Sequence, residues 1–244
     1  MRFYVSPDSV YLDRHLIEVK DSSELHHIRD VMRLKPDDNV TVFDGKGREY
    51  SGEIDTIDRH TAVINIKKVT EVKKDKSPYV ILFQAIPKKN KMDFIVEKSV
   101  ELGVSVVVPI VTERTIPVVT EKACNKLERW RRISRAASKQ CGRTELPLIS
   151  DILDFEKAIA KAKENDLVIF PAIVTGSDSL KEIVNKKRTA DNRIAVFVGP
   201  EGDFSHTEIE IAKKNGFSVC SLGSRVLRVE TAALYVLSCL NYEN

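Results

Sequence analysis

Two stretches decide the fold of the second half of this chain: Val196-Phe-Val-Gly-Pro-Glu-Gly-Asp-Phe204 and Ser221-Leu-Gly-Ser-Arg-Val-Leu-Arg-Val-Glu-Thr-Ala-Ala233. Each begins as an apolar strand, passes through a loop that contains glycine, and enters a helix. In an open α/β sheet, the loops at the carboxyl ends of the strands form the ligand site. The two loops therefore predict one shared pocket.

The composition is that of an ordinary globular protein. The 244 residues are 42% hydrophobic and 31% charged, and a formal net charge of +3 favours no class of partner by itself. No apolar run approaches the roughly 20 residues that span a bilayer. The N-terminus lacks the apolar core of a signal peptide. We therefore expect no membrane association and a reducing, cytoplasmic compartment.

The cysteines show neither a C-x-x-C pair nor a histidine at metal-ligand spacing. We expect them to be reduced, buried and unreactive, and we expect no metal site. The four positions are Cys124, Cys141, Cys220 and Cys239.

Residues 1–72 predict a small β-barrel. Asp21 and Glu24 have the spacing of a capping box, for a short helix that ends near Met32. Several short strands joined by tight turns, with little helix, are typical of such a barrel. The expected strands are 39–44, 48–57 and 61–66, with a hairpin turn at 44–47. Residues 73–78 are charged and end in proline, which indicates a linker.

Residues 79–244 alternate between apolar strands and amphipathic helices. This order predicts an α/β domain whose mostly parallel sheet is covered on both faces. The expected strands are 79–86, 104–110, 166–170, 193–198 and 217–222. Helices are expected at 90–102, 123–141 and 232–240, and after capping boxes that begin at Ser179 and Ser205.

The loop Gly199-Pro-Glu-Gly202 has neither the Walker A spacing nor the G-x-G-x-x-G spacing. Pro200 has no N–H group to offer a phosphate, so a phosphate cradle is disfavoured. A short G-x-x-G turn instead suits the close approach of backbone to a flat or zwitterionic ligand. The alternative is a tight turn with a structural role only.

The second loop interleaves charges with apolar residues directly before a helix that is apolar nearly all round. Arg225, Arg228 and Glu230 are costly next to a buried helix unless they are paired or used. The alternative to a functional role is an internal ion pair between Arg228 and Glu230.

The helix at 123–141 carries a dense row of basic residues, which is plausible as an RNA-binding surface and equally plausible as a solvated face. Further basic residues lie in both domains, which favours nucleic acid. The candidate RNA contacts are Arg29, Arg33, Lys88, Lys91, Arg129, Arg132, Arg135 and Lys139. His206 is either a proton carrier or an exposed residue of a helix's first turn.

Several motifs in one order resemble the RsmE family of bacterial 16S ribosomal RNA uracil-N3 methyltransferases, within the SPOUT (trefoil-knot) superfamily. Beyond the two loops, the first-helix motif matches Lys91-Met-Asp-Phe-Ile-Val-Glu-Lys-Ser-Val-Glu-Leu-Gly-Val104. The basic-helix motif matches Arg129-Trp130 and Ala136-Ala-Ser-Lys-Gln-Cys-Gly-Arg143. In the N-terminal barrel, Val31-Met-Arg-Leu34 and Phe43-Asp-Gly-Lys-Gly47 match. The resemblance covers nearly the whole chain.

The resemblance implies a C-terminal SPOUT domain with a deep trefoil knot, a PUA-like N-terminal β-barrel, and a homodimer. It also implies S-adenosylmethionine as the cofactor and a uridine in the decoding region of 16S rRNA, in the small ribosomal subunit, as the substrate. The implied cofactor contacts are Phe170, Gly199, Pro200, Glu201, Gly202, Leu222, Gly223, Arg225, Leu227 and Arg228.

The implied reaction methylates uracil N3, whose proton must leave before or during attack. A cation beside the base favours its anion, so Arg228 and Arg143 are the expected catalytic cations. Glu230 is expected to orient an arginine or to take the proton.

Two positions depart from the family pattern. The family usually has glycine where this chain has Asp203, and an acidic residue where it has Lys139. Asp203 favours a rival interpretation, a non-catalytic RNA-binding or ribosome-assembly protein. A second rival is a SPOUT enzyme that methylates a ribose 2′-hydroxyl.

Overall fold

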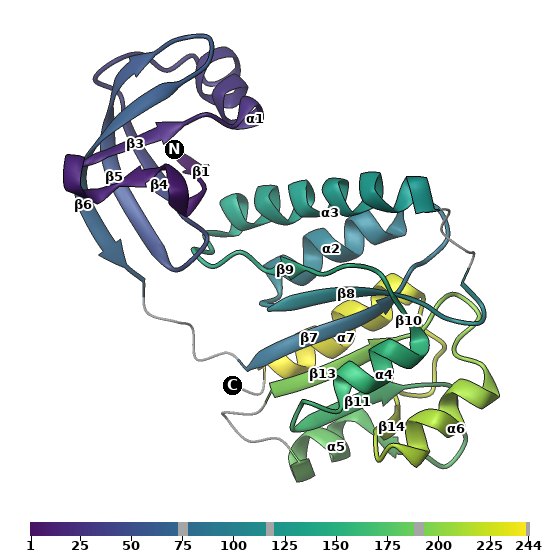
Figure 1. Ribbon diagram of the computed structural model, residues 1–244. Coiled ribbons are helices and arrows are strands. Elements are labelled where there is room, and N and C mark those ends of the chain that lie inside the picture. Colours follow the sequence, from purple (N-terminus) through teal and green to yellow (C-terminus); the bar gives the residue numbers. More distant parts are fainter. Residues whose placement is uncertain (73–77, 116–119, 188–192, 243–244) are drawn as a thin grey trace. The chain divides into compact units, whose positions relative to one another are not determined.

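The computed structural model describes residues 1–72, 78–115, 120–187 and 193–242 (Figure 1). The chain forms two compact units. The first contains residues 1–75 and 138–146, and the second contains residues 76–137 and 147–244. Residues 138–146, at the end of a long helix, therefore group with the N-terminal unit. The expected linker at 73–78 lies outside the described residues except for Pro78.

The first unit is built on one sheet with the strand order β1-β4-β5-β6-β3-β2 among its described residues. β1 and β4 pair in parallel, and the other pairs are antiparallel. The strands are β1 (Arg2–Tyr4), β2 (Val10–Tyr11), β3 (Leu16–Val19), β4 (Asn39–Phe43), β5 (Arg48–Ile57) and β6 (Ala62–Glu71). Two 3-10 turns, Pro7–Ser9 and Leu12–Arg14, flank β2, and the helix α1 (Ser22–His26) runs into a π-helical turn at His27–Val31.

The helix and hairpin predicted in this unit are confirmed. Asp21 caps α1, since its Oδ1 accepts the N–H groups of Ser23 and Glu24 at 2.9 and 3.1 Å. The π-helical turn then carries the helical segment to Val31. Strand β6 runs five residues further than predicted, to Glu71, and the short strands β1, β2 and β3 were not predicted.

The second unit alternates strands and helices, as predicted. Its strands are β7 (Tyr79–Ala85), β8 (Val106–Val111), β9 (Leu148–Ile149), β10 (Leu153–Asp154), β11 (Leu167–Pro171), β12 (Asp178–Ser179), β13 (Arg193–Val198) and β14 (Ser218–Ser221). Its helices are α2 (Lys91–Glu101), α3 (Thr120–Cys141), α4 (Phe155–Ala162), α5 (Leu180–Lys187), α6 (His206–Lys214) and α7 (Val229–Tyr242). The helix α4 and the short strands β9, β10 and β12 were not predicted.

The sheet of this unit has the order β10-β8-β7-β13-β11-β14-β12, with β9 beside β8. Every pair of strands among the described residues is parallel, which confirms the predicted α/β class. Consecutive parallel strands bring their carboxyl ends to one edge of the sheet, where loops from β11, β13 and β14 meet. The trefoil knot stays a prediction of the resemblance.

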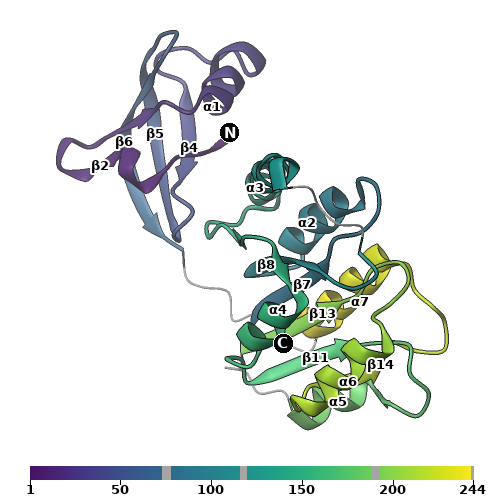
Figure 2. The same ribbon diagram turned by 45° about the vertical axis from the view of Figure 1, so that its right-hand side comes forward.

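Helices cover both faces of this sheet (Figures 1 and 2). Alternate residues of β7 show the division: Leu82 packs with α2, α5 and α7 on one face, and Phe83 packs with α4 and α6 on the other. Both side chains are fully buried. Burial of one such side chain stabilises the fold by roughly 1.5–3 kcal/mol.

Candidate functional site

A cavity of about 480 Å³ lies at the carboxyl edge of the parallel sheet. Three loops form its walls: the loop after β11, the loop after β13, and the segment from the end of β14 into α7. Lys91, from α2, completes the lining. The predicted pocket shared by two loops is confirmed, and the loop after β11 is a third contributor that was not predicted.

The loop after β13 requires small residues at its start. A Cβ atom on Gly199 would lie 3.1 Å from the Phe204 ring and 3.2 Å from Asp203 Oδ1, which is tighter than ordinary contact. The Asp203 N–H donates to Pro200 O at 2.9 Å and closes the turn. Gly199 therefore keeps the backbone of the loop close to both the core and the cavity.

Asp203 occupies the position where the family usually has glycine. Its φ of 60° lies in the left-handed region, which explains why glycine suits the site. Its carboxylate accepts the N–H of Ile173 at 2.7 Å, so it joins the loop after β13 to the loop after β11. An aspartate tolerates this backbone conformation better than most residues. The departure is therefore compatible with a formed cavity.

Arg114 holds the same loop from outside, and sequence reasoning missed it. Its guanidinium donates to Gly202 O, and also to Phe204 O at 3.3 Å. The predicted capping box of α6 is complete: Ser205 Oγ accepts the Glu208 N–H, and the Glu208 carboxylate accepts the Ser205 N–H. Arg114 contacts backbone carbonyl oxygens, which every residue has. No pattern of side chains in the sequence therefore predicts the role of Arg114.

The segment after β14 exposes most of its charged residues. Gly223 has a φ of 119°, and its N–H donates to Ser221 Oγ at 3.1 Å. Arg225 and Arg228 are exposed and line the cavity. Helix α7 begins at Val229 rather than at Ala232, so Glu230 belongs to its first turn. Gly223 thus supplies the turn that brings both arginines to the cavity.

Glu230 pairs with Lys91. The alternative to a functional role, an internal ion pair between Arg228 and Glu230, is not what the structure shows. Lys91 Nζ lies 3.3 Å from Glu230 Oε2 and 3.4 Å from Glu201 Oε1. Burial by itself would raise the pKa of Glu230, but its own backbone N–H, Lys91 and, further off, Arg228 bring it below the ordinary value. The Lys88 N–H also donates to Glu201, at 3.0 Å. Lys88 and Lys91 were predicted to contact RNA, and the structure places both against the cavity loops.

Phe170 and Gly202 were predicted to contact the cofactor, and neither lines this cavity. The Phe170 ring is fully buried and packs 4.3 Å from the Phe204 ring, between centroids. The next residue, Pro171, lines the cavity in its place. Arg143 belongs to residues 138–146 of the first unit, whereas the cavity is built from the second unit.

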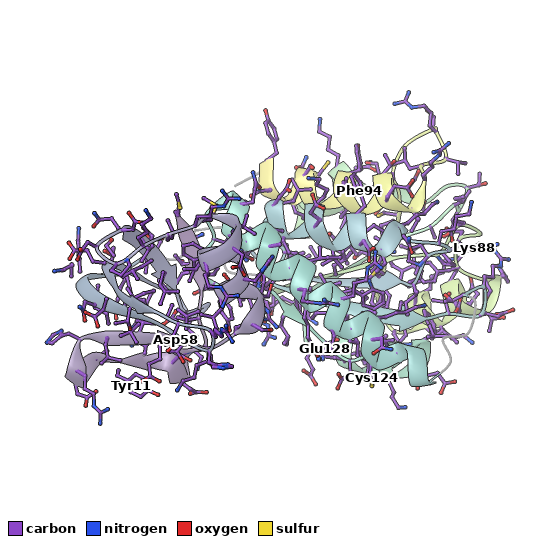
Figure 3. The ribbon with its side chains drawn as sticks, turned by 90° about the horizontal axis from the view of Figure 1, so that it is seen from above. Tyr11, Asp58, Lys88, Phe94, Cys124 and Glu128 are labelled. Atoms are coloured by element: carbon purple, nitrogen blue, oxygen red, sulfur yellow. The ribbon has the colours of Figure 1, made fainter. Side chains whose placement is uncertain are left out.

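Ion pairs occupy much of the predicted basic face of α3. Arg129 pairs with Asp93, and Arg131 pairs with Glu128 at 2.8 Å. Figure 3 shows Glu128 on this helix. Arg132 is exposed and Arg135 is partly buried. This face therefore combines solvated ion pairs with cations that an RNA could reach.

The predicted RNA contacts of the first unit are also partly engaged. Arg29 donates twice to Asp30, at 2.8 Å each, and this holds the pKa of Asp30 well below its usual range. Lys139 Nζ lies 2.8 Å from Glu24 Oε1, and the Glu24 side chain is only 5% exposed. Arg33 is exposed, in a left-handed conformation with φ 53°. Lys139 therefore has a structural partner inside the first unit.

A second cavity, of about 440 Å³, lies beside the first and shares Asp203 and the loop after β11 with it. His206, the first residue of α6, lines it together with Arg114 and Lys213. The His206 side chain is exposed, as the structural alternative for this residue expected.

The cysteines differ from the expectation of burial. Cys220 is buried, and burial raises the pKa of its thiol to about 12. Cys124 and Cys141 are both exposed on α3, and Figure 3 shows Cys124 on this helix. Among the described residues, no group of three metal-ligating side chains comes together, and no helix there is long and apolar enough to cross a membrane.

Comparison with protein-family models identifies the class of protein that has this architecture. A family model described as an RNA methyltransferase domain matches residues 74–241, which include the parallel sheet and the cavity. A second model, described as an RNA methyltransferase PUA domain, matches residues 19–67. The fold and the site thus define an RNA methyltransferase with a PUA domain.

Individual relatives narrow this class. Ribosomal RNA small subunit methyltransferase E of Buchnera aphidicola subsp. Schizaphis graminum is 33% identical, over 89% of this chain and 87% of its own length. The Bacillus subtilis protein of that name is 28% identical, over 90% and 88%. The chain belongs to the RsmE family of small-subunit ribosomal RNA methyltransferases.

Two solved structures are similar over almost the whole chain. A methyltransferase from Legionella pneumophila, in complex with S-adenosylmethionine, matches with a TM-score of 0.89 and 30% identity, over 99% of this chain and 97% of that one. Ribosomal RNA small subunit methyltransferase E from Neisseria gonorrhoeae, bound to S-adenosylmethionine, matches with a TM-score of 0.85 and 29% identity, over the same shares.

Proposed function

We propose that this protein transfers a methyl group from S-adenosylmethionine to N3 of a uridine in the decoding region of 16S rRNA. The observation that carries the proposal is the cavity that three loops form at the carboxyl edge of the parallel sheet. It lies in the domain that matches the RNA methyltransferase model and two structures bound to S-adenosylmethionine. We also propose that the enzyme acts in the cytoplasm, in keeping with a ribosomal RNA substrate.

The residues of the cavity fit this cofactor. S-adenosylmethionine combines a flat base with a zwitterionic amino acid, and the cavity combines apolar walls with charged ones. Leu222 and Leu227 supply apolar surface, and Lys91 and Glu201 supply charge of both signs. Gly199 packs against Phe204 and Asp203, where a Cβ atom would intrude, and the backbone of this tight turn lines the cavity, where it can approach a ligand. We propose that backbone of the loops after β13 and β14 holds most of the cofactor.

When bound, the cofactor supplies an electrophilic methyl group on a sulfonium. The protein's task is to orient the uracil for in-line attack, and orientation alone can lower the barrier by roughly 7–11 kcal/mol. Loops fixed to each other, as Asp203 fixes two of them, hold such a geometry. We therefore assign most of the rate enhancement to positioning.

The catalytic cation in this proposal is Arg228, which favours the N3 anion of the uracil. The role of Arg143 stays a prediction, because this residue belongs to the other unit. Arg228 is exposed at the rim of the cavity, free of the core, and so can reach a base that enters from solvent. Glu230 does not line the cavity, whereas its partner Lys91 does. This arrangement favours Glu230 as a residue that orients a cation over Glu230 as the group that takes the proton.

RNA binding is assigned to both units. Phosphate contacts supply most of the affinity of a nucleic-acid-binding protein and position it on its target. Arg33 and Arg132, which are exposed, are the leading candidates. The other predicted contacts already have partners in the structure, and they would lose or keep these partners on binding RNA. These residues are Arg29, Arg129, Arg135 and Lys139.

We also propose that the protein is a homodimer. Phe94 on α2 is 46% exposed, and Tyr235 on α7 is 43% exposed. The two helices pack against each other, and Figure 3 shows Phe94 beside α7. Large apolar side chains left in solvent on two adjacent helices suit contact with a second copy of the chain.

One experiment separates the proposed reaction from its rivals. The purified protein is incubated with 30S subunits and isotopically labelled S-adenosylmethionine, and the methylated nucleotide is mapped by mass spectrometry. We expect a base-methylated uridine. A ribose 2′-O-methyl group would show the other SPOUT chemistry. Absence of both methyl transfer and calorimetric uptake of S-adenosylmethionine would show a non-catalytic RNA-binding protein. Asp203 no longer supports that last interpretation, because it fits its loop.

A further inference from the structure

Three segments of the chain meet at one ammonium group on the cavity wall. Lys91 Nζ, from the first turn of α2, lies within ion-pair distance of Glu201, in the loop after β13, and of Glu230, in the first turn of α7. The backbone N–H of Lys88 donates to both Glu201 carboxylate oxygens, at 3.0 and 3.3 Å. We name these residues (Lys88, Lys91, Glu201 and Glu230) the Lys91 cluster.

In the Lys91 cluster one ammonium faces two carboxylates, because Lys88 contributes its backbone N–H and not its side chain. The side chains of Lys91, Glu201 and Glu230 are 31%, 26% and 20% exposed, so water screens their interactions only in part. Without Lys91, the two carboxylates would remain close to each other and would repel. Lys91 therefore holds two cavity segments together that would otherwise separate.

The acceptor oxygen of Glu230 shows that the cluster is held by charge more than by ideal hydrogen bonds. Glu230 Oε2 is buried, and no donor in the described part of the chain bonds to it with hydrogen-bond geometry, although Lys91 Nζ lies at 3.3 Å. Lys91 and Glu230 still form an ion pair, because an ion pair requires the two charges to be close but not the donor and acceptor to be aligned. Such a pair depends on Lys91 keeping its charge and its place.

We propose that Lys91 is a positioning residue of the methyl-donor site: it ties Glu201 to Glu230 and so fixes the loop after β13 against the starts of α2 and α7. This inference rests on the proposed function for the identity of the ligand. The assignment replaces the predicted role of Lys91 as an RNA contact.

The chain offers a matched control on the same helix. Lys98 also bridges two carboxylates, Glu97 and Glu101, with Nζ–Oε1 distances of 2.8 Å to each. Its hydrogen bonds to Glu101 and then Glu97 raise the pKa of Lys98 to about 12. Lys98 does not line the cavity, so Lys98→Met removes the same kind of ion-pair bridge without touching the site.

The first test measures the affinity of Lys91→Met for S-adenosylmethionine and for S-adenosylhomocysteine by calorimetry. We expect both affinities to fall by about fivefold or more, because the loops that form the wall lose their tie. Lys91→Arg should keep most of the affinity, and Lys98→Met should equal the wild type. Loss for S-adenosylmethionine alone would overturn the proposal, because a wall that has lost its tie should weaken the binding of both ligands. No loss for either ligand would overturn it too.

Repulsion between the two carboxylates predicts two kinds of rescue. Glu201 is faced by Lys91 and the Lys88 N–H, and Glu230 by Lys91 and Arg228. Lys91 helps to lower the pKa of Glu230, so in Lys91→Met this pKa should rise, and the loss of affinity should shrink as the pH falls and Glu230 is protonated. The double variant Lys91→Met/Glu230→Gln should recover affinity at neutral pH. A role in packing alone predicts neither rescue, and their absence would count against the proposal.

A third measurement needs no ligand. Hydrogen exchange of the peptides covering residues 86–90 and 199–203 is compared in the ligand-free wild type, Lys91→Met and Lys98→Met. Exchange should be faster only in Lys91→Met, and equal exchange in all three would overturn the proposal. If the wild type bound no S-adenosylmethionine, the proposed function would fail, and this measurement would still decide the role of Lys91.

Discussion

Asp203 combines an unfavourable backbone conformation with a useful side-chain contact. Its φ of 60° costs a residue with a Cβ atom about 1–2 kcal/mol relative to glycine, while its hydrogen bond to Ile173 returns about 1 kcal/mol. Asp203→Gly should thus be close to neutral in stability. Asp203→Ala, which keeps the Cβ atom and loses the bond, should be less stable than Asp203→Gly by about 1–2 kcal/mol. Denaturant unfolding of both variants checks the order, and an alanine variant as stable as the glycine variant would contradict it.

Arg228 should matter to turnover far more than to cofactor affinity. As an exposed cation at the cavity rim, it is proposed to stabilise charge that develops on the uracil during reaction. Removal of one such group commonly costs about a hundredfold or more in rate. Arg228→Ala should lose turnover on that scale in single-turnover assays, with nearly unchanged calorimetric affinity for S-adenosylmethionine. The exposed Lys214→Ala is the control, and unchanged turnover in Arg228→Ala would refute the assignment.

Thiol reactivity should divide the cysteines by exposure. Cys124 and Cys141 are exposed, whereas burial raises the pKa of Cys220 to about 12, so its thiol carries almost no nucleophilic thiolate at pH 8. Iodoacetamide at pH 8 followed by peptide mass spectrometry should modify Cys124 and Cys141 within the time that leaves Cys220 intact. Equal rates at Cys220 would show that its surroundings open to solvent.

At the scale of elements, the N-terminus of helix α6 positions the loop after β13, which lines the cavity. The capping box of Ser205 and Glu208 is buried, and Glu208 also accepts the Glu113 N–H at 2.9 Å. Ser205→Ala should destabilise the protein by about 1 kcal/mol or more. The matched change Ser179→Ala removes an exposed cap on α5 and should cost less. Thermal unfolding compares the two, and an equal cost would mean that the burial of the α6 cap contributes nothing.

The elements that the sequence predicted correctly are those with strong local signals. Apolar runs such as 79–86 and the three-to-four-residue spacing of α3 have few alternatives. The strands β1, β2 and β3 are two to four residues long and depend on their partners, so local pattern could not reveal them. The cavity was predictable from loops that follow strands. Its Lys91 cluster was not: Lys88 and Glu201, for example, are 113 positions apart, and no sequence spacing relates them.

At the scale of the whole molecule, the proposed dimer can be tested through one side chain. Tyr235 lies on the exposed side of α7, so Tyr235→Glu should leave the monomer folded. If α7 contacts a second copy, burial of the new carboxylate would weaken the dimer by at least tenfold. Sedimentation velocity across a concentration series measures this, with the change Tyr11→Glu at a partly exposed position of the first unit as a comparison. A wild-type monomer, or a Tyr235→Glu dimer of full strength, would contradict the proposal.

The assignment of residues 138–146 to the first unit has a consequence for how this architecture can be inherited. The chain leaves that unit near residue 75, returns to it at 138 and leaves again after 146. One cut between residues 73 and 77 would therefore leave the two units covalently joined. A gene fragment encoding residues 1–75 would likewise lack part of the unit that it begins. The first unit, as its internal contacts define it, is therefore not encoded by one contiguous stretch of the gene.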